Sequence, residues 1–362
     1  MLYLLLFPLH QLFSFLNIFR YITFRAAMAA LTAFLISIIL GPLVIRKLKS
    51  LKLGEKIAKN DSLRLDELHQ HKKDTPTMGG ILILAAIVIS TVLWADIANR
   101  NIIIALFATL WLGITGFIDD YLKQIKKRPK GLNAVSKLTS QIVLGLILGS
   151  ILYLDPHSSI RLDLPFVKDL SINLDGFFIL FVILVIAGSS NAVNLTDGLD
   201  GLAIGIVVMV AIAFSILCYV SGNIKLSAYL LIPYIKGSGE LTVFCASILG
   251  AGLGFLWFNC YPATVFMGDV GSLALGGAIG TVALLIKKEL LLIVVGGIFV
   301  LEALSVILQV ASFKLTKKRL FKIAPLHHHF QFLNWPENKV IVRFWIVAAL
   351  LALLTIVTLK IR

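Results

Sequence analysis

The sequence predicts an all-α polytopic membrane protein with about ten transmembrane helices. Hydrophobic residues make up 59% of the 362 residues and charged residues only 14%. The mean hydropathy is +0.95, which is far above that of a water-soluble domain. The chain also divides into apolar segments of about 17–25 residues, the length that crosses a bilayer as a helix. Helices are favoured because they satisfy their own backbone hydrogen bonds in lipid.

Ten apolar segments define the predicted spans. They cover residues 22–45, 77–95, 102–118, 138–154, 177–189, 201–220, 241–258, 267–286, 290–312 and 340–360. The opening residues 1–17 are apolar but lack a basic start and a small-residue cleavage site, so we expect an interfacial segment and not a removed signal peptide. The whole chain, residues 1–362, is predicted to form a single integral-membrane domain.

The distribution of lysine and arginine predicts the orientation of the spans. Loops 46–76, 119–137, 190–200, 259–269 and 313–339 together carry about three times as many of these residues as loops 96–101, 155–176, 221–240 and 287–289. By the positive-inside rule the first set is cytoplasmic and both termini are periplasmic. The net charge of +14 is then explained by orientation and by attraction to anionic membrane lipid, with no nucleic acid partner.

The outer loops have structural patterns. Apolar and polar residues alternate over 159–174 around Pro165, which predicts a short periplasmic β-hairpin. Residues 224–235 are compatible with a short interfacial helix. The three cysteines lie in or beside apolar segments, with neither a disulfide framework nor a zinc-site spacing.

Two adjacent carboxylates, Asp119 and Asp120, end the uncharged segment 102–118. The C-terminal end of a helix is the negative end of its dipole, so acids there are unfavourable by about 0.3–1 kcal/mol each. A bound cation would offset this, and Mg²⁺ with a phosphate substrate is the usual case. The alternative is a pair of hydrated acids at the membrane interface.

The third cytoplasmic loop is unusually polar. Residues 188–202 carry Asn191, Asn194, Asp197 and Asp200 between two apolar spans. Asparagine and aspartate serve as helix caps and turn formers, but one or two would suffice for that purpose. We therefore expect a functional site with irregular backbone, which membrane proteins tolerate only beside protein or a wet cavity.

The last two cytoplasmic loops add an acid and three histidines. Asp269 precedes a Gly- and Ala-rich segment, where it fits a helix N-cap and also an anion-binding helix start. His327–His329 follow a basic stretch; in an extended segment His327 and His329 would share one face. Glu302, inside an apolar span, is expected to hydrogen-bond to a neighbouring helix, with Gln309 as a candidate partner.

These polar groups all project to one membrane face under a topology derived from lysine and arginine alone. Carboxylates with lysines at a membrane surface suit Mg²⁺-assisted phosphoryl transfer between a soluble and a lipid partner. The rival class is an ion-coupled transporter, which would place its acids near the middle of the membrane on discontinuous helices and show internal repeats. The sequence lacks both features.

Several motifs closely resemble the phospho-N-acetylmuramoyl-pentapeptide transferase family. They are TPTMGG (75–80), GFIDDYLK (116–123), NAVNLTDGLDGLA (191–203), GFLWFNCYPATVFMGDVGSLALGG (254–277) and PLHHHF (325–330). The resemblance implies a dimeric enzyme of the bacterial inner membrane with its active site on the cytoplasmic face. It would transfer phospho-N-acetylmuramoyl-pentapeptide from UDP-MurNAc-pentapeptide to undecaprenyl phosphate, forming lipid I and UMP.

The resemblance also implies roles for individual residues, with Mg²⁺ as the cofactor. Those expected to be catalytic are Asp119, Asp120, Asp269, His327 and His328, with Asp269 as the metal ligand; those expected to bind substrate are Lys72, Lys123, Lys137, Asn191, Asp197, Gly198, Leu199, Phe266 and His329. Asp74 departs from the glycine common in the family, so the sequence does not decide which of Lys72 and Lys73 contacts substrate.

The alternative enzyme is a sister transferase that loads N-acetylglucosamine 1-phosphate onto the same polyprenyl phosphate. The acidic motifs would be shared by both enzymes. The PLHHHF and TPTMGG motifs favour the muramoyl branch.

Overall fold

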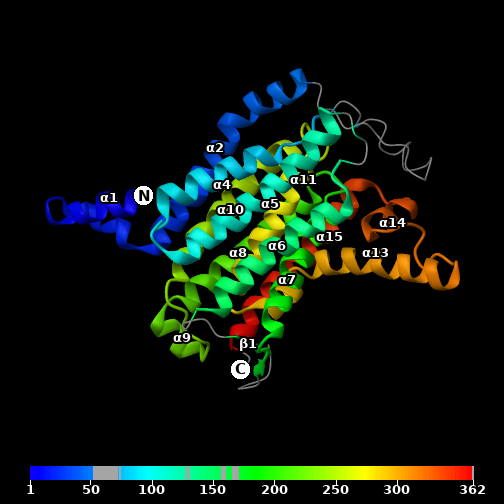
Figure 1. Cartoon of the computed structure of the whole chain (residues 1–362). Coiled ribbons are helices and arrows are strands. Elements are labelled where there is room, and N and C mark those ends of the chain that lie inside the picture. Colours follow the sequence, from blue (N-terminus) through cyan, green and yellow to red (C-terminus); the bar gives the residue numbers. More distant parts are fainter. Residues whose placement is uncertain are drawn as a thin grey trace.

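The computed structural model describes residues 1–51, 72, 75–126, 128, 131–155, 160–164 and 171–360, and it confirms the all-α class (Figure 1). Within these ranges nine helices are long and apolar enough to cross a membrane. Predicted span 77–95 corresponds to α4, which has only 15 residues. The helices are α1 (Leu2–Leu6), η1 (Phe7–Gln11), η2 (Ser14–Arg20), α2 (Ile22–Ser50), α4 (Gly80–Trp94), α5 (Arg100–Gln124), α6 (Ala134–Tyr153), α7 (Phe177–Thr196), α8 (Leu202–Ser221), α9 (Ile224–Leu230), α10 (Gly239–Asn259), α11 (Gly268–Leu285), α12 (Glu289–Val295), α13 (Gly297–Thr316), α14 (Leu326–Phe332), α15 (Glu337–Val357) and η4 (Thr358–Lys360).

Helix α11 forms the centre of the bundle, where it packs against α4, α5 and α7. Its sequence GDVGSLALGGAIGTVALL is rich in glycine and alanine, and nearly all of its residues are buried. Small side chains allow helix backbones to approach closely, which is the usual way that helices associate in lipid. Helix α10 packs in turn against α2 and α8, so small-residue helices hold the middle of the fold (Figure 1).

The outer elements agree with the sequence in part. Strands β1 (Arg161–Asp163) and β2 (Ser171–Asn173) pair antiparallel, with Leu162 opposite Ile172, which confirms the hairpin. A short helix, α9, is present where one was expected over 224–235, but it ends at Leu230.

Predicted span 290–312 is not one continuous helix. It is divided at Gly296 into the short α12 and the longer α13. Helix α13 projects away from the bundle (Figure 1, orange).

Two other predictions, about the polar loops, were wrong. Helix α7 runs through Thr196, so the expected irregular backbone over 190–200 is helical except at its end. His327–His329 lie in α14 and not in an extended segment. In each place one polar side chain has its partner on another helix: Asn194 contacts Asp269 of α11, and His327 contacts Glu302 of α13.

Candidate active site

Three carboxylates from two helices converge at one end of the bundle. Asp119 and Asp120 lie in the last two turns of α5, and Asp269 lies in the first turn of α11. One oxygen from each lies within 4.8 Å of the other two. Asp119 and Asp120 are almost fully buried.

Close packing of α5 against α11 brings these acids together. A Cβ atom on Gly116 of α5 would lie 2.1 Å from the carbonyl oxygen of Asp269, so the two backbones touch there. Gly268 begins α11 with a φ of +73°, a conformation that favours glycine. Within this first turn the backbone N–H of Val270 points at the Asp120 carboxylate, to which it donates over 3.1 Å. Asp269 therefore lies inside the helix. It is not the N-cap that the sequence suggested, because Met267 holds that position.

Two lysines neutralise much of the acidic charge. Lys123 contacts Asp119 one turn earlier on α5 and also lies 3.0 Å from Asp269. Lys137, from the first turn of α6, lies 2.9 Å from Asp119 and also pairs with Asp269. Both lysines keep partial access to solvent, with side-chain exposures of 32% and 19%. Both lysines were expected to bind substrate, and the structure places both ammonium groups beside the carboxylates of Asp119 and Asp269.

Asn194 and Ser272 complete the cluster. Asn194 lies in the loop where a functional site was expected, although it was given no role of its own, and Ser272 was not predicted. Asn194 donates to the Asp269 carboxylate over 2.7 Å and to the Ser272 hydroxyl over 2.8 Å. A signal was present in the sequence, since Asn191, Asn194 and Asp197 are spaced three residues apart, as neighbours on one helix face are. That signal was lost because this stretch was expected to be irregular.

The donor set fits a hard divalent cation. Carboxylate oxygens are the preferred ligands of Mg²⁺, which is commonly held by one or two carboxylates together with substrate phosphates. Asp120 contacts neither of the two lysines in the ion pairs described above, and one of its oxygens lies in the convergent set. Asp119, Asp120 and Asp269 are thus the residues of the described chain that are suited to hold such an ion.

Lys72 belongs to a second, buried ionic cluster. Its ammonium group lies 2.7 Å from Asp200 and 2.6 Å from Glu337. Asp200 also accepts a hydrogen bond from the Ala263 backbone N–H over 2.9 Å. These ion pairs connect three parts of the chain: Lys72 precedes α4, Asp200 lies in the turn between α7 and α8, and Glu337 begins α15. Glu337 was not predicted, and its distance along the chain from Lys72 gives no local sequence signal.

His327 forms a third cluster with Glu302. The Glu302 carboxylate accepts from the His327 backbone N–H and contacts its Nδ1, both over 3.1 Å. Both side chains are fully buried. The other ring nitrogen, Nε2, has no hydrogen-bond partner and lies against Gly198, where an added Cβ would be 2.3 Å from it. The expected helix-to-helix partner of Glu302 is therefore His327; Gln309 instead bonds to the backbone of Leu320 and Phe321.

The other two histidines lie nearer the surface. His328 Nδ1 is 2.8 Å from the side-chain oxygen of Gln331, and His329 Nδ1 accepts from the Lys322 backbone N–H. The helical backbone separates the three rings, so His327 and His329 do not share one face as expected.

The remaining predicted residues surround these clusters. Asn191 donates to Gln141 over 2.8 Å, Asp197 ends α7, and Leu199 is buried in the turn that follows. Phe266 is half-buried; its carbonyl accepts from the Gly79 N–H over 2.8 Å, which fixes TPTMGG beside the start of α11. The contacts of Lys72 and Asn191 lie outside the three acids, so the structure does not bring every predicted residue into one cluster.

Comparisons with known proteins define the class first. Residues 102–287 match the model of glycosyl transferase family 4, so the chain is a membrane-embedded member of that group. Residues 72–84 match signature 1 of phospho-N-acetylmuramoyl-pentapeptide-transferase.

Curated relatives specify the family. Phospho-N-acetylmuramoyl-pentapeptide-transferases from Desulforapulum autotrophicum and Desulfatibacillum aliphaticivorans are each 53% identical to this chain, and both chains are covered completely. The protein of that name from Citrifermentans bemidjiense is 52% identical over the same share. The chain belongs to the phospho-N-acetylmuramoyl-pentapeptide-transferase family, and the resemblance inferred from its motifs is confirmed.

Proposed function

We propose that this protein transfers phospho-N-acetylmuramoyl-pentapeptide from UDP-MurNAc-pentapeptide to undecaprenyl phosphate, yielding lipid I and UMP for peptidoglycan synthesis. The observation that carries the proposal is the convergence of three acids and two lysines at one bundle end, in a chain 53% identical throughout to transferases of that name. An ion-coupled transporter is not supported, because these acids lie at helix ends and not at mid-helix.

The acids are proposed to hold Mg²⁺, with Asp269 as the principal ligand. When bound, the ion neutralises charge on the diphosphate of the sugar nucleotide. Lys123 and Lys137 bridge Asp119 and Asp269 and are the basic groups nearest to the place where the diphosphate would lie. Their partial exposure leaves them able to exchange a carboxylate for a phosphate oxygen.

The lipid phosphate is proposed to attack the substrate directly. A phosphate monoester is largely a dianion at pH 7, so it is already a competent nucleophile. One of its oxygens forms a bond to the β-phosphorus, the phosphorus bonded to the sugar. The bond from that phosphorus to the bridging oxygen breaks, and UMP leaves with the electron pair. Asp119 positions the nucleophile or takes its residual proton.

The nucleotide is proposed to bind beside the acids, on the side of the α7–α8 turn. Lys72, Asn191, Asp197, Gly198, Leu199 and Phe266 would line the uridine or phosphate site. His327 Nε2 lies against Gly198, which supports a role for His327–His329 as hydrogen-bond donors to the bound nucleotide.

The setting is proposed to be the bacterial inner membrane, with this end of the bundle facing the cytoplasm and the chain acting as one domain in a homodimer. The charge distribution in the loops supports the orientation. The membrane itself would supply undecaprenyl phosphate.

Incubation of the purified protein with both substrates tests the function. UMP should be released only when UDP-MurNAc-pentapeptide, undecaprenyl phosphate and Mg²⁺ are all present. UDP-N-acetylglucosamine in place of the muramoyl substrate should give no product. Release from UDP-N-acetylglucosamine alone would replace the proposal with the sister activity.

A single-turnover experiment tests direct attack. Concentrated, lipid-depleted enzyme mixed with UDP-MurNAc-pentapeptide should release no UMP until lipid phosphate is added. A burst close to one UMP per active site, with phosphate trapped on Asp119 or Asp120, would show a covalent intermediate and refute the direct route.

A further inference from the structure

A polar cavity lies at the end of α5 opposite to the three acids. The acids occupy the last two turns of α5, whereas Arg100 begins it. At 1.5 Å per residue, the 19 steps from Arg100 to Asp119 span about 30 Å, the thickness of a bilayer core. The cavity is therefore at the opposite membrane face and does not belong to the proposed active site.

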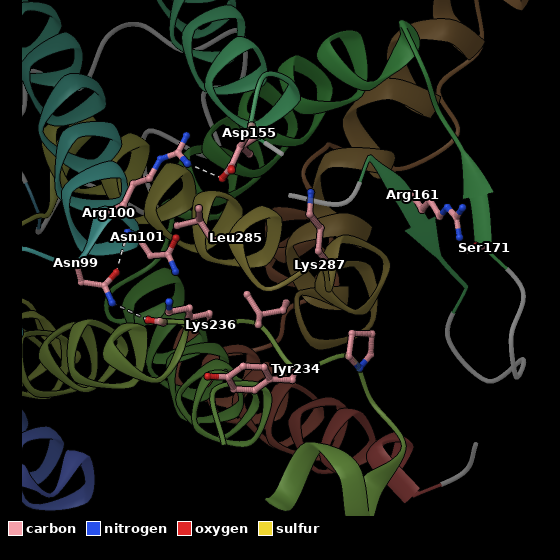
Figure 2. A pocket seen from close by; sticks show the side chains of 14 residues that line it. Asn99, Arg100, Asn101, Asp155, Arg161, Ser171, Tyr234, Lys236, Leu285 and Lys287 are labelled. Carbon is pink, nitrogen blue, oxygen red and sulfur yellow. Dashed lines mark hydrogen bonds and ion pairs between the residues drawn. The ribbon is translucent and has the colours of Figure 1, made fainter. Parts of the chain in front are cut away.

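The cavity has the size and mixed lining of a ligand site. Its volume is about 750 Å³, within the range of about 300–1,000 Å³ typical of small-molecule sites. Apolar side chains, including Leu152, Ile235 and Leu285, line part of it. The rest of the lining is mostly polar and comes from the start of α5, the β-hairpin and the loops that follow α6, α9 and α11 (Figure 2).

Its charge is predominantly positive. Among the described lining residues, Arg100, Arg161, Lys236 and Lys287 are basic and Asp155 is acidic. Asp155 pairs with Arg100, and Arg161, Lys236 and Lys287 border the same space.

Lys287 shows that one of these cations is held in place. It is only 8% exposed, and its ammonium lies 4.6 Å from the centroid of the Phe178 ring. The face of an aromatic ring attracts a cation, so this contact helps to fix the ammonium beside the cavity.

We infer that this cavity binds the phosphate headgroup of an anionic lipid from the leaflet opposite the active site. The basic side chains would contact the phosphate, while the apolar side chains would contact the first carbons of the lipid. Inorganic phosphate shares the headgroup chemistry but has nothing to place against the apolar lining. The proposed transferase activity does not require this site.

The test uses Arg161→Gln combined with Lys236→Gln, since both side chains are exposed and their replacement leaves the core untouched. Lys225→Gln on α9 is the matched control, because Lys225 is an exposed lysine that does not line the cavity. Native mass spectrometry of the full chain in detergent would count retained dioleoylphosphatidylglycerol and dioleoylphosphatidylcholine. Thermal unfolding without added lipid checks that each variant is folded.

The wild-type protein should retain at least one phosphatidylglycerol that phosphatidylcholine does not replace. Each basic contact is worth about fivefold in affinity for an anionic headgroup, so the double variant should bind that lipid about 25-fold more weakly. The control should bind as the wild type does. Unchanged binding by the double variant would overturn the site, and complete displacement by equimolar inorganic phosphate would overturn its assignment to lipid.

Discussion

Replacing Asp269 by Asn should abolish transfer and also destabilise the protein. In a simple N-cap the exchange would be almost neutral, since asparagine caps a helix as well as aspartate does. The structure removes that expectation. One Asp269 oxygen accepts from Lys123 and Lys137, and the other accepts from Asn194. An asparagine has a single acceptor oxygen, so either orientation of its amide directs N–H groups at other donors.

The magnitude follows from the burial of the ion pairs. Asp269 is 15% exposed, and Lys137 is 19% exposed. Exposed pairs contribute about 0.2–1 kcal/mol, and breaking a fully buried pair costs about 3–5 kcal/mol. We therefore expect the free energy of unfolding to fall by about 1–3 kcal/mol. The turnover rate should fall at least about 100-fold, as is typical when one group that stabilises transition-state charge is lost.

Two measurements separate the metal role from the structural role. Mg²⁺ at about 100 times its dissociation constant should raise the free energy of unfolding of the wild type by about 2.7 kcal/mol and should leave Asp269→Asn unchanged. In Asp269→Asn the two lysines share the single carboxylate of Asp119. Adding Lys137→Gln to the variant removes one of these two positive charges and should restore part of the stability, but no activity beyond that of Lys137→Gln alone. Ser272→Ala, which alters the hydrogen bonds without a change in charge, should stay close to wild type in UMP release.

Near-normal UMP release by Asp269→Asn at ordinary Mg²⁺ concentrations would refute the assignment. So would a Mg²⁺-dependent stabilisation that survives the substitution. Either result would mean that Asp269 serves only to neutralise the two lysines.

Other substitutions test the neighbouring clusters. When His327, His328 and His329 are replaced singly by alanine, His327→Ala should reduce transfer most. It should also lower the free energy of unfolding by about 1–3 kcal/mol, since it leaves the buried Glu302 carboxylate without its ring partner. Full activity in all three variants would contradict a role for the histidines. Glu302→Gln should lower the turnover rate with little change in KM. A lower turnover rate together with an equally large rise in KM would indicate a general folding defect. Lys72→Met should destabilise by about 3–5 kcal/mol because two acids stay buried without a cation, whereas Glu337→Gln keeps one of the two pairs and should cost less by thermal unfolding.

The sequence was sufficient for the fold class because lipid restricts the choices. Apolar segments that are long enough to cross a bilayer must form helices. The lysine and arginine content of successive loops predicts which loops lie on the same side of the membrane. The same frame predicted that Asp119, Asp120 and Asp269 approach one another, and the structure confirms this proximity. The hairpin was predictable too, since alternation around a turn is a local pattern.

What the sequence did not reveal is where polar residues find partners. Asn194 reads as a turn former, yet it is helical because Asp269 and Ser272 satisfy its amide from another helix. The break at Gly296 was missed for the opposite reason. Hydropathy continues through residues 290–312, and an apolar sequence does not report a change of helix direction.

The break at Gly296 sets the direction of α13, and α13 contacts the site through Glu302. Only four residues of α13 are buried, and these residues, Ile298, Phe299, Glu302 and Ser305, lie on one face. A carboxylate in a membrane helix is unfavourable unless a partner satisfies it, so Glu302 restricts α13 to positions where α14 can reach it. The contact acts in both directions, because the same carboxylate holds the backbone and the ring of His327. The direction that α13 takes after Gly296 therefore determines where His327 Nε2 meets Gly198, and a substitution that shifts α13 should disturb the site without touching any of the three acids.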